Sequence, residues 1–408
     1  MFMAKKEKKD LDLWKKKYSL REIVPIALIS LLIGTLFGGI ITYKKDKLEI
    51  SKVPEELEEL VQVYDSISEN YYHKVDKKSL VDSAIEGMIG SLDDPYSVFL
   101  NKNESTKFNE TISGEYVGIG ATVSFNEDKL EVIEVLDSSP AKKAGLKEKD
   151  IILKINGEDL TNKSLSEITN MIRGEKNTTV SLLIKRDNKE KRIEIVREDI
   201  EIDSVESEVI EKDDQKIGYL SIDTFASNSY TQFKQKLEKL EKKKIDSLII
   251  DVRDNPGGHL TQATDIIELF LKKGKILYQI EQKGKNQKMY DQTSEYRKYK
   301  VVVLTNHSSA SASEILASSL KESYQAILVG EATYGKGTVQ KAYQLSSGNT
   351  VKYTTQKWLT AKGEWINEKG VSPDYEVSLD EEYIKNPVSE NDNQLNKSLE
   401  ILTEKEDK

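Results

Sequence analysis

Three short segments of the sequence carry residue types that could do chemistry, and the first is rich in serine. Residues 308–314 follow an apolar run typical of a buried strand, residues 301–304, and lead into an apolar helical pattern. A serine at such a strand-to-helix turn is exposed, and the amides of the helix N-terminus point toward it. This arrangement suits a nucleophile beside an oxyanion hole. The same serines could instead cap the helix, with Ser309 or Ser311 as N-cap and Glu314 completing a capping box.

The second segment, residues 330–338, is rich in glycine and contains one lysine, Lys336. It nearly matches the phosphate-binding loop G-x-x-x-x-G-K-[ST], which would indicate an ATPase. However, Gly337 stands where that loop needs a Mg²⁺-binding hydroxyl. The residues that follow have the pattern of a strand, whereas a phosphate-binding loop leads into a helix.

The third segment, residues 251–258, follows an apolar strand and ends in two adjacent glycines, Gly257 and Gly258. Glycines allow the backbone to approach a ligand closely and to aim amides at it. A tight turn alone would also explain the pair.

Together, the three segments predict a serine nucleophile with a lysine base. The sequence has neither a G-x-S-x-G elbow nor a well-placed histidine, so the base must be another group. A lysine can accept a proton only when neutral, which requires burial to lower its pKa from about 10.4 toward 7. The glycines on both sides of Lys336 leave room for such enclosure. Serine/lysine pairs are a known variant of the catalytic triad.

The composition excludes several other kinds of site. The 408 residues include no cysteine, which rules out disulfides, thiolate metal sites and a cysteine nucleophile. The three histidines are scattered along the chain, and no H-E-x-x-H motif occurs. We therefore expect neither a metal nor a cofactor.

One segment near the N-terminus has the length and composition of a membrane anchor. Residues 23–43 contain no charge, and 21 helical residues span about 30 Å. Eight lysines and arginines precede them, so the positive-inside rule places residues 1–22 in the cytoplasm and the catalytic region outside the cell membrane. A cleavable signal peptide is the alternative, but no A-x-A site follows. Gly34 and Gly38 form a G-x-x-x-G spacing that would also allow a homodimer.

The rest of the chain reads as an acidic, multidomain α/β protein. The net charge of the chain is −9, and residues 1–47 carry +6, so the remaining residues carry −15. Because this acidic part would repel nucleic acid, nucleic acid is not an expected partner. Residues 44–112 show helical periodicity, and short β-like runs follow over residues 113–200. Strands then alternate with helices over residues 201–380, which indicates α/β layering. Residues 381–408 form a polar tail that ends in one helix.

At this point the sequence resembles the C-terminal processing peptidases, also called tail-specific proteases. The resemblance covers nearly all of residues 80–402 and rests on several separate motifs. These are Ser91-Leu92-Asp93-Asp94-Pro95-Tyr96-Ser97, Tyr116-Val117-Gly118-Ile119-Gly120, Ser139-Pro140-Ala141, Asp254-Asn255-Pro256-Gly257-Gly258, Ser309-Ala310-Ser311-Ala312-Ser313-Glu314 and Gly335-Lys336-Gly337-Thr338-Val339-Gln340.

The resemblance implies a PDZ domain at 113–200 inserted before an α/β serine-protease core at 201–380. By motif position, Ser311 becomes the nucleophile, Lys336 the general base and Gln340 the residue that orients the lysine. The amides of Gly257 and Ala312 would form the oxyanion hole. If a strand follows Lys336, the even spacing to Gln340 places both on one face.

For the PDZ domain, the resemblance implies recognition of peptide tails. The amides of Val117, Gly118, Ile119 and Gly120 would hold the terminal carboxylate, while an apolar C-terminus fills the adjacent groove. The expected partners are therefore proteins or peptides with free apolar C-termini, and the expected activity is endopeptidase cleavage near these tails. The alternative is a membrane-anchored PDZ adaptor without catalysis, which would bind the same peptides and leave them intact.

Overall fold

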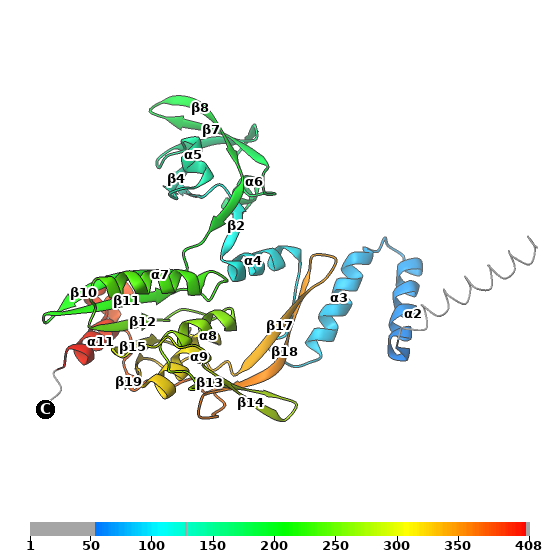
Figure 1. Ribbon diagram of the computed structural model, residues 1–408. Coiled ribbons are helices and arrows are strands. Elements are labelled where there is room, and N and C mark those ends of the chain that lie inside the picture. The colour runs from blue at the N-terminus through cyan, green and yellow to red at the C-terminus, as the bar shows by residue number, and fades with distance from the viewer. Residues whose placement is uncertain (1–53, 127–128, 405–408) are drawn as a thin grey trace, which may run out of the picture. The chain divides into compact units, whose positions relative to one another are not determined.

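The computed structural model describes residues 54–126 and 129–404 (Figure 1). The membrane helix expected at residues 23–43 lies outside them, as does the G-x-x-x-G pair. Within the described ranges, no helix is both long and apolar enough to cross a membrane. The chain divides into two units, Met1–Ile85 and Glu86–Lys408.

Two helices follow Pro54, where the sequence shows helical periodicity, and they are α2 (Glu55–Asn70) and α3 (Lys77–Gly90). Three glutamates occupy the first turn of α2, where negative charge is favourable to the helix dipole. Neither helix contains a buried residue, so their apolar side chains remain partly or fully exposed.

A short strand and a helix follow α3. These are β1 (Val98–Leu100) and α4 (Lys102–Ser113). Asn101 and Glu104 form a capping box at the start of α4, and Gly114 ends the helix in the left-handed conformation (φ 72°). The chain then enters the expected β-rich module through a two-stranded ladder that joins β2 (Glu115–Gly118) to β9 (Glu198–Glu201).

The β-rich module is built on a six-stranded sheet with two short helices. The strand order is β3-β4-β5-β7-β8, and β6 pairs with β5. The alternating apolar residues of these strands form a core of their own, together with Ile168 and Ile172 of the second helix. The elements are β3 (Ala121–Asn126), β4 (Lys129–Val135), α5 (Pro140–Ala144), β5 (Ile151–Ile155), β6 (Glu158–Asp159), α6 (Leu165–Ile172), β7 (Thr179–Arg186) and β8 (Lys189–Val196).

The expected α/β core is centred on a second six-stranded sheet, of order β10-β11-β12-β15-β16-β19 (Figure 1). The β10–β11 pair is antiparallel, and the other neighbours run parallel. The strands are β10 (Val205–Lys212), β11 (Gln215–Ile222), β12 (Ser247–Asp251), β15 (Lys300–Thr305), β16 (Ile327–Gly330) and β19 (Tyr375–Glu376).

Helices cover both faces of this sheet, which explains its continuous apolar strands. In β12, Leu248 and Ile250 join the core cluster that includes residues of α7, α8 and α9, whereas Ile249 joins a cluster with Leu395 and Leu399 of α11. The covering helices are α7 (Ser229–Lys242), α8 (Leu260–Glu268), α9 (Ala312–Ser319) and α11 (Asn393–Thr403), whereas the short helix α10 (Glu381–Lys385) contains no buried residue. The apolar periodicity of residues 263–271 predicts a helix that starts at Ala263, whereas α8 begins three residues earlier, after its N-cap His259, which follows the glycine pair.

A third sheet completes the core, with order β1-β18-β13-β14 and β17 paired to β18. All its pairs are antiparallel. Its strands are β13 (Ile276–Gln282), β14 (Lys285–Tyr290), β17 (Thr338–Gln344) and β18 (Thr350–Leu359). Because β17 begins two residues after Lys336, the lysine segment leads into a strand, and the ATPase interpretation is wrong.

Candidate active site

The three chemically interesting segments converge because each follows the carboxyl end of a parallel strand. Strands β12, β15 and β16 are neighbours in the sheet, and the loops after them begin at Val252, Asn306 and Glu331. Such loops meet at one edge of an α/β sheet, where ligands commonly bind. They surround a cavity of about 660 Å³ whose wall includes all five residues expected from the protease motifs. These are Gly257, Ser311, Ala312, Lys336 and Gln340.

Ser311 occupies a strained turn between β15 and α9. Its backbone angles, φ 57° and ψ −110°, are unfavourable for a residue with a Cβ atom. Helix α9 begins with the next residue, Ala312. Within the described residues, the Ala312 amide donates no hydrogen bond, as expected for the first N–H of a helix. The turn therefore presents a serine and a free amide together at the cavity wall.

Lys336 is mostly enclosed by protein. Burial, assisted by the positive charge of Lys352, lowers its pKa to about 8, while Glu314 and Asp94 act in the opposite direction. Its Nζ lies 5.1 Å from the centre of the Tyr96 ring. A substantial fraction of Lys336 is thus neutral near pH 8, as a general base requires.

The glycines beside Lys336 are required by close packing. A Cβ at Gly335, whose φ is 89°, would lie 2.9 Å from the backbone nitrogens of Lys369 and Gly370. A Cβ at Gly337 would lie 2.7 Å from Trp365 Nε1. A larger residue at either position would collide with these neighbours. Glycine at both positions therefore allows the protein to pack closely around the lysine.

Glu314 joins the serine turn to the lysine loop. Its carboxylate is fully buried. Oε2 accepts hydrogen bonds from the backbone nitrogens of Ser311 (2.7 Å) and Lys336 (2.9 Å). Oε1 accepts from Thr333 Oγ1 (2.6 Å) and the Gly335 nitrogen (2.7 Å). The sequence indicated only a capping role for this residue, whereas the structure shows it binding both loops.

Asn255 plays a similar part between the glycine loop and the serine turn. Its side chain is fully buried and donates to the carbonyl of Ile222 (2.8 Å). Its backbone carbonyl accepts from the Ala310 nitrogen (3.0 Å) and from Ser313 Oγ (2.9 Å). One asparagine therefore holds Ala310, which directly precedes Ser311, and Ser313, two residues after it.

Asn255 also accepts a hydrogen bond from one of the two backbone amides that are expected to form the oxyanion hole. The Gly257 nitrogen donates to Asn255 Oδ1 at 2.8 Å. A Cβ at Gly257, whose φ is 103°, would lie 3.0 Å from the Cβ of Ser311, so the loop passes very close to the serine. In this conformation the Ala312 amide is free and the Gly257 amide is engaged.

Gln340 shares a strand face with Thr338, as its even spacing predicts. Its side-chain nitrogen donates to Thr338 Oγ1 (2.9 Å) and to Thr354 Oγ1 (3.2 Å) on β18. Lys336 precedes the strand, and a register shift occurs between Val339 and Gln340. The orienting role of Gln340 toward Lys336 stays a prediction.

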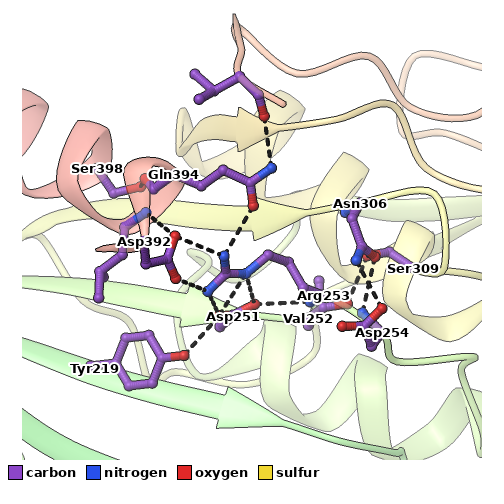
Figure 2. A network of polar contacts seen from close by, with 12 residues as sticks. Tyr219, Asp251, Val252, Arg253, Asp254, Asn306, Ser309, Asp392, Gln394 and Ser398 are labelled. Atoms are coloured by element: carbon purple, nitrogen blue, oxygen red, sulfur yellow. Dashed lines mark hydrogen bonds and ion pairs between the residues drawn. The ribbon is translucent and has the colours of Figure 1, made fainter. Parts of the chain in front are cut away.

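A buried ion network fixes the start of the glycine loop (Figure 2). The Arg253 guanidinium bonds Asp251 at the end of β12 (2.6 Å) and Asp392 just before α11 (2.8 Å). It also donates to Gln394 of α11 (3.0 Å), and Tyr219 donates to Asp251 (2.7 Å). The C-terminal helix is thereby attached to the strand that leads into the loop.

The expected peptide-binding residues lie at the junction of β2 and β3. Val117 and Gly118 belong to β2, where they pair with Asp199 and Glu198. Ile119 is buried in the core of the module, and its carbonyl accepts from the Ala141 nitrogen (2.8 Å). Strand β3, which follows Gly120, lies at one end of the strand order. An edge strand is the element to which an extended peptide can add.

Comparison with known proteins identifies the family. Residues 216–377 match peptidase family S41, residues 117–196 match the PDZ domain, and residues 40–104 match the N-terminal domain of the activating protease CtpB. The carboxy-terminal processing protease CtpB of Bacillus subtilis is 36% identical over 397 residues, which cover 94% of this chain and 82% of that protein. The chain belongs to the carboxy-terminal processing proteases.

This carboxy-terminal processing protease is therefore a serine peptidase of family S41 with a PDZ domain. It is also 40% identical to the carboxy-terminal processing protease CtpA of Bacillus subtilis over 337 residues, which cover 82% of this chain and 72% of that protein. Among solved structures, the photosystem II D1 C-terminal processing protease aligns with 80% of this chain and 94% of its own, at 24% identity and a TM-score of 0.48.

Proposed function

We propose that this carboxy-terminal processing protease cleaves peptide bonds with Ser311 as nucleophile and Lys336 as general base. The observation that carries the proposal is that one buried carboxylate, Glu314, holds the backbones of both residues at the wall of one cavity. The lowered pKa of Lys336, about 8, supplies a base that is partly neutral in the physiological range.

Acylation follows from these positions. Neutral Lys336 accepts the Ser311 hydroxyl proton as Oγ attacks the carbonyl carbon of the substrate. The Ala312 amide stabilises the resulting oxyanion, and the protonated lysine then gives its proton to the leaving amine. In the second half of the reaction, Lys336 takes a proton from the water that attacks the acyl-serine, and it gives this proton to Ser311 Oγ as the bond to the acyl group breaks and the carboxylic acid product leaves.

The oxyanion hole gains its second donor when the Gly257 amide leaves Asn255. Its hydrogen bond to Asn255 Oδ1 competes with a bond to the oxyanion. A rotation of the Pro256–Gly257 peptide is feasible because Gly257, at φ 103°, has no side chain to restrict this angle. One such donor contributes about 3 to 4 kcal/mol to lowering the barrier.

We further propose that the protease acts outside the cell membrane, anchored by residues 23–43, on proteins with free apolar C-termini. The uncharged segment after eight basic residues supports the anchor, and the PDZ domain supports tail recognition. Incubation of the full-length chain with a labelled, unstructured peptide that has an apolar C-terminus tests the proposed substrate class. We expect fragments from this peptide, and binding without fragments would contradict the proposal.

The pH dependence of cleavage tests the lysine base. Only neutral Lys336 accepts a proton, so kcat/KM should rise with pH and reach half its maximum near pH 8, the pKa of this lysine. A pH-independent rate between 6.5 and 9 would contradict the assignment. Circular dichroism across the same range controls for unfolding.

Amidated peptides test the recognition of tails. If the PDZ domain binds a terminal carboxylate, amidation of a substrate peptide should weaken its binding about tenfold, because the charged acceptor is lost. Fluorescence anisotropy with Ser311→Ala measures binding without turnover. Equal affinity for the free acid and the amide would show that the domain recognises something other than the tail.

A further inference from the structure

A second lysine contributes to the wall of the same cavity. Lys352 lies on β18, between Val98 of β1 and Ala342 of β17. The register pairs Ala342 with Lys352 and Gln340 with Thr354. Since residues two positions apart share a face of a strand, Lys352 points to the same side of the β17–β18 hairpin as Gln340.

Lys352 has no acidic partner of its own in the part of the chain that the structure describes. Within residues 54–126 and 129–404, its ammonium forms neither a hydrogen bond nor an ion pair, and Nζ lies 5.7 Å from the centre of the Phe108 ring. Burial lowers the pKa of Lys352, and the negative charge of Asp94 partly opposes this effect. The Asp94 carboxylate itself accepts hydrogen bonds from Ser97 Oγ (2.5 Å) and the Tyr96 nitrogen (3.1 Å). An unpaired, desolvated ammonium is costly to a fold, which calls for a function.

We propose that Lys352 is a positioning residue of the active site, whose positive charge keeps Lys336 in the neutral form that accepts the serine proton. The inference rests on the proposed role of Lys336 as the base. Two ammonium groups that share a cavity repel each other, so the pair loses its first proton at a lower pH than either lysine would alone. Burial acts on both lysines and more strongly on Lys336, so we assign the lost proton to Lys336 and the remaining charge to Lys352.

Two carboxylates near Lys336 have the opposite effect on its pKa, which they raise. Glu314 and Asp94 both favour the protonated lysine, the first from α9 and the second from the loop before β1. Lys341 and His259 also line the cavity, but Lys341 is exposed to solvent, where water screens its charge. Burial and Lys352 are therefore the two influences that hold Lys336 neutral against two carboxylates.

The pH profile of kcat/KM for the full-length chain tests this inference. Lys352→Met keeps the length of the aliphatic stem and removes the charge, Lys352→Arg keeps the charge, and Lys341→Met removes an exposed charge from the same wall. We expect Lys352→Met to move the midpoint about one pH unit higher, which lowers the rate at pH 7 about tenfold and leaves the rate at pH 10 unchanged. Lys352→Arg and Lys341→Met should retain the wild-type midpoint.

Three results would overturn the inference. The first is an unchanged midpoint in Lys352→Met with a raised KM for free-acid peptides, which would make Lys352 a binding group for the substrate carboxylate. The second is an Arg variant that behaves like the Met variant, which would indicate a dependence on shape. If Lys352→Met does not fold, Lys352→Gln takes its place. The third result is then a pH profile of Lys352→Gln with the same midpoint as that of the wild type. Failure of the proposed dyad is recognised separately, since Lys336→Met would then remain active.

Discussion

Ser311→Ala should lower kcat for peptide cleavage by at least about 10³-fold, and Lys336→Ala should do the same. The nucleophile and its base act as a unit, so removing either one removes the covalent route. The measurement is the rate of fragment release from a labelled peptide at pH 8. Activity of Lys336→Ala near that of the wild type would exclude the lysine as the base.

The neighbouring serines provide matched controls for the nucleophile. Ser309 Oγ donates to the carbonyl of Val252 (2.7 Å), and Ser313 Oγ donates to the carbonyl of Asn255 (2.9 Å). Both hydroxyls are buried and donate to backbone carbonyls. Replacing either serine by alanine should therefore lower the free energy of unfolding by about 1 kcal/mol and leave most of kcat intact.

The stability of a lysine variant distinguishes lost chemistry from lost structure. The pKa of Lys336 is about 8 in the folded chain, below its unfolded value, so the unfolded chain binds more protons between pH 8 and 10.5. Stability therefore rises with pH across this range. At pH 7, Lys336→Met should be more stable than the wild type by up to about 3 kcal/mol, and the difference should vanish above pH 10.5.

Glu314→Gln should lower both stability and activity, because Glu314 accepts four hydrogen bonds from two loops. A glutamine places an NH₂ group against at least one backbone N–H donor. The Gly335 nitrogen faces one carboxylate oxygen and the Ser311 and Lys336 nitrogens face the other, so neither orientation of the glutamine amide avoids this clash. We expect a loss of about 3 kcal/mol in the free energy of unfolding and at least a tenfold decrease in kcat.

Urea denaturation and peptide cleavage at pH 8 measure the two effects of Glu314→Gln. Glu322→Gln is the matched control, because Glu322 is less buried and accepts one hydrogen bond, from the Lys362 nitrogen (2.7 Å). If Glu314→Gln retained full activity, the placement of the serine turn and the lysine loop would not depend on the shared carboxylate.

Local sequence signals located most of the elements that carry the site. The apolar runs at Leu248–Ile250 and Val301–Leu304 predicted buried strands, and both lie inside β12 and β15. Ser139, which precedes Pro140, and Ser164, which precedes an apolar helical pattern, predict helix starts because a serine hydroxyl can satisfy a free amide at a helix N-terminus, and they are the N-caps of α5 and α6. The first residue of an element is harder to predict from the sequence than the element itself, as the earlier start of α8 shows.

Contacts between distant segments could not be derived from local pattern. Glu314 and Lys336 are 22 residues apart, and only the adjacency of β15 and β16 brings their loops together. The same holds for Arg253 and Asp392, which meet because α11 returns to cover the sheet (Figure 2). The motif suggested the Gly257 amide as an oxyanion donor, but its engagement by Asn255 depends on a side-chain rotamer that no sequence signal specifies.

The most direct test of the serine/lysine mechanism is covalent labelling with a fluorophosphonate, followed by mass spectrometry of the modified peptide. The reagent reacts with an activated serine, so the account predicts one adduct, on Ser311, formed at a rate that rises with pH through about 8. Lys336→Met should label at least about 10³-fold more slowly. An adduct on another serine, or an unchanged labelling rate in Lys336→Met, would contradict the proposal that these two residues perform the chemistry.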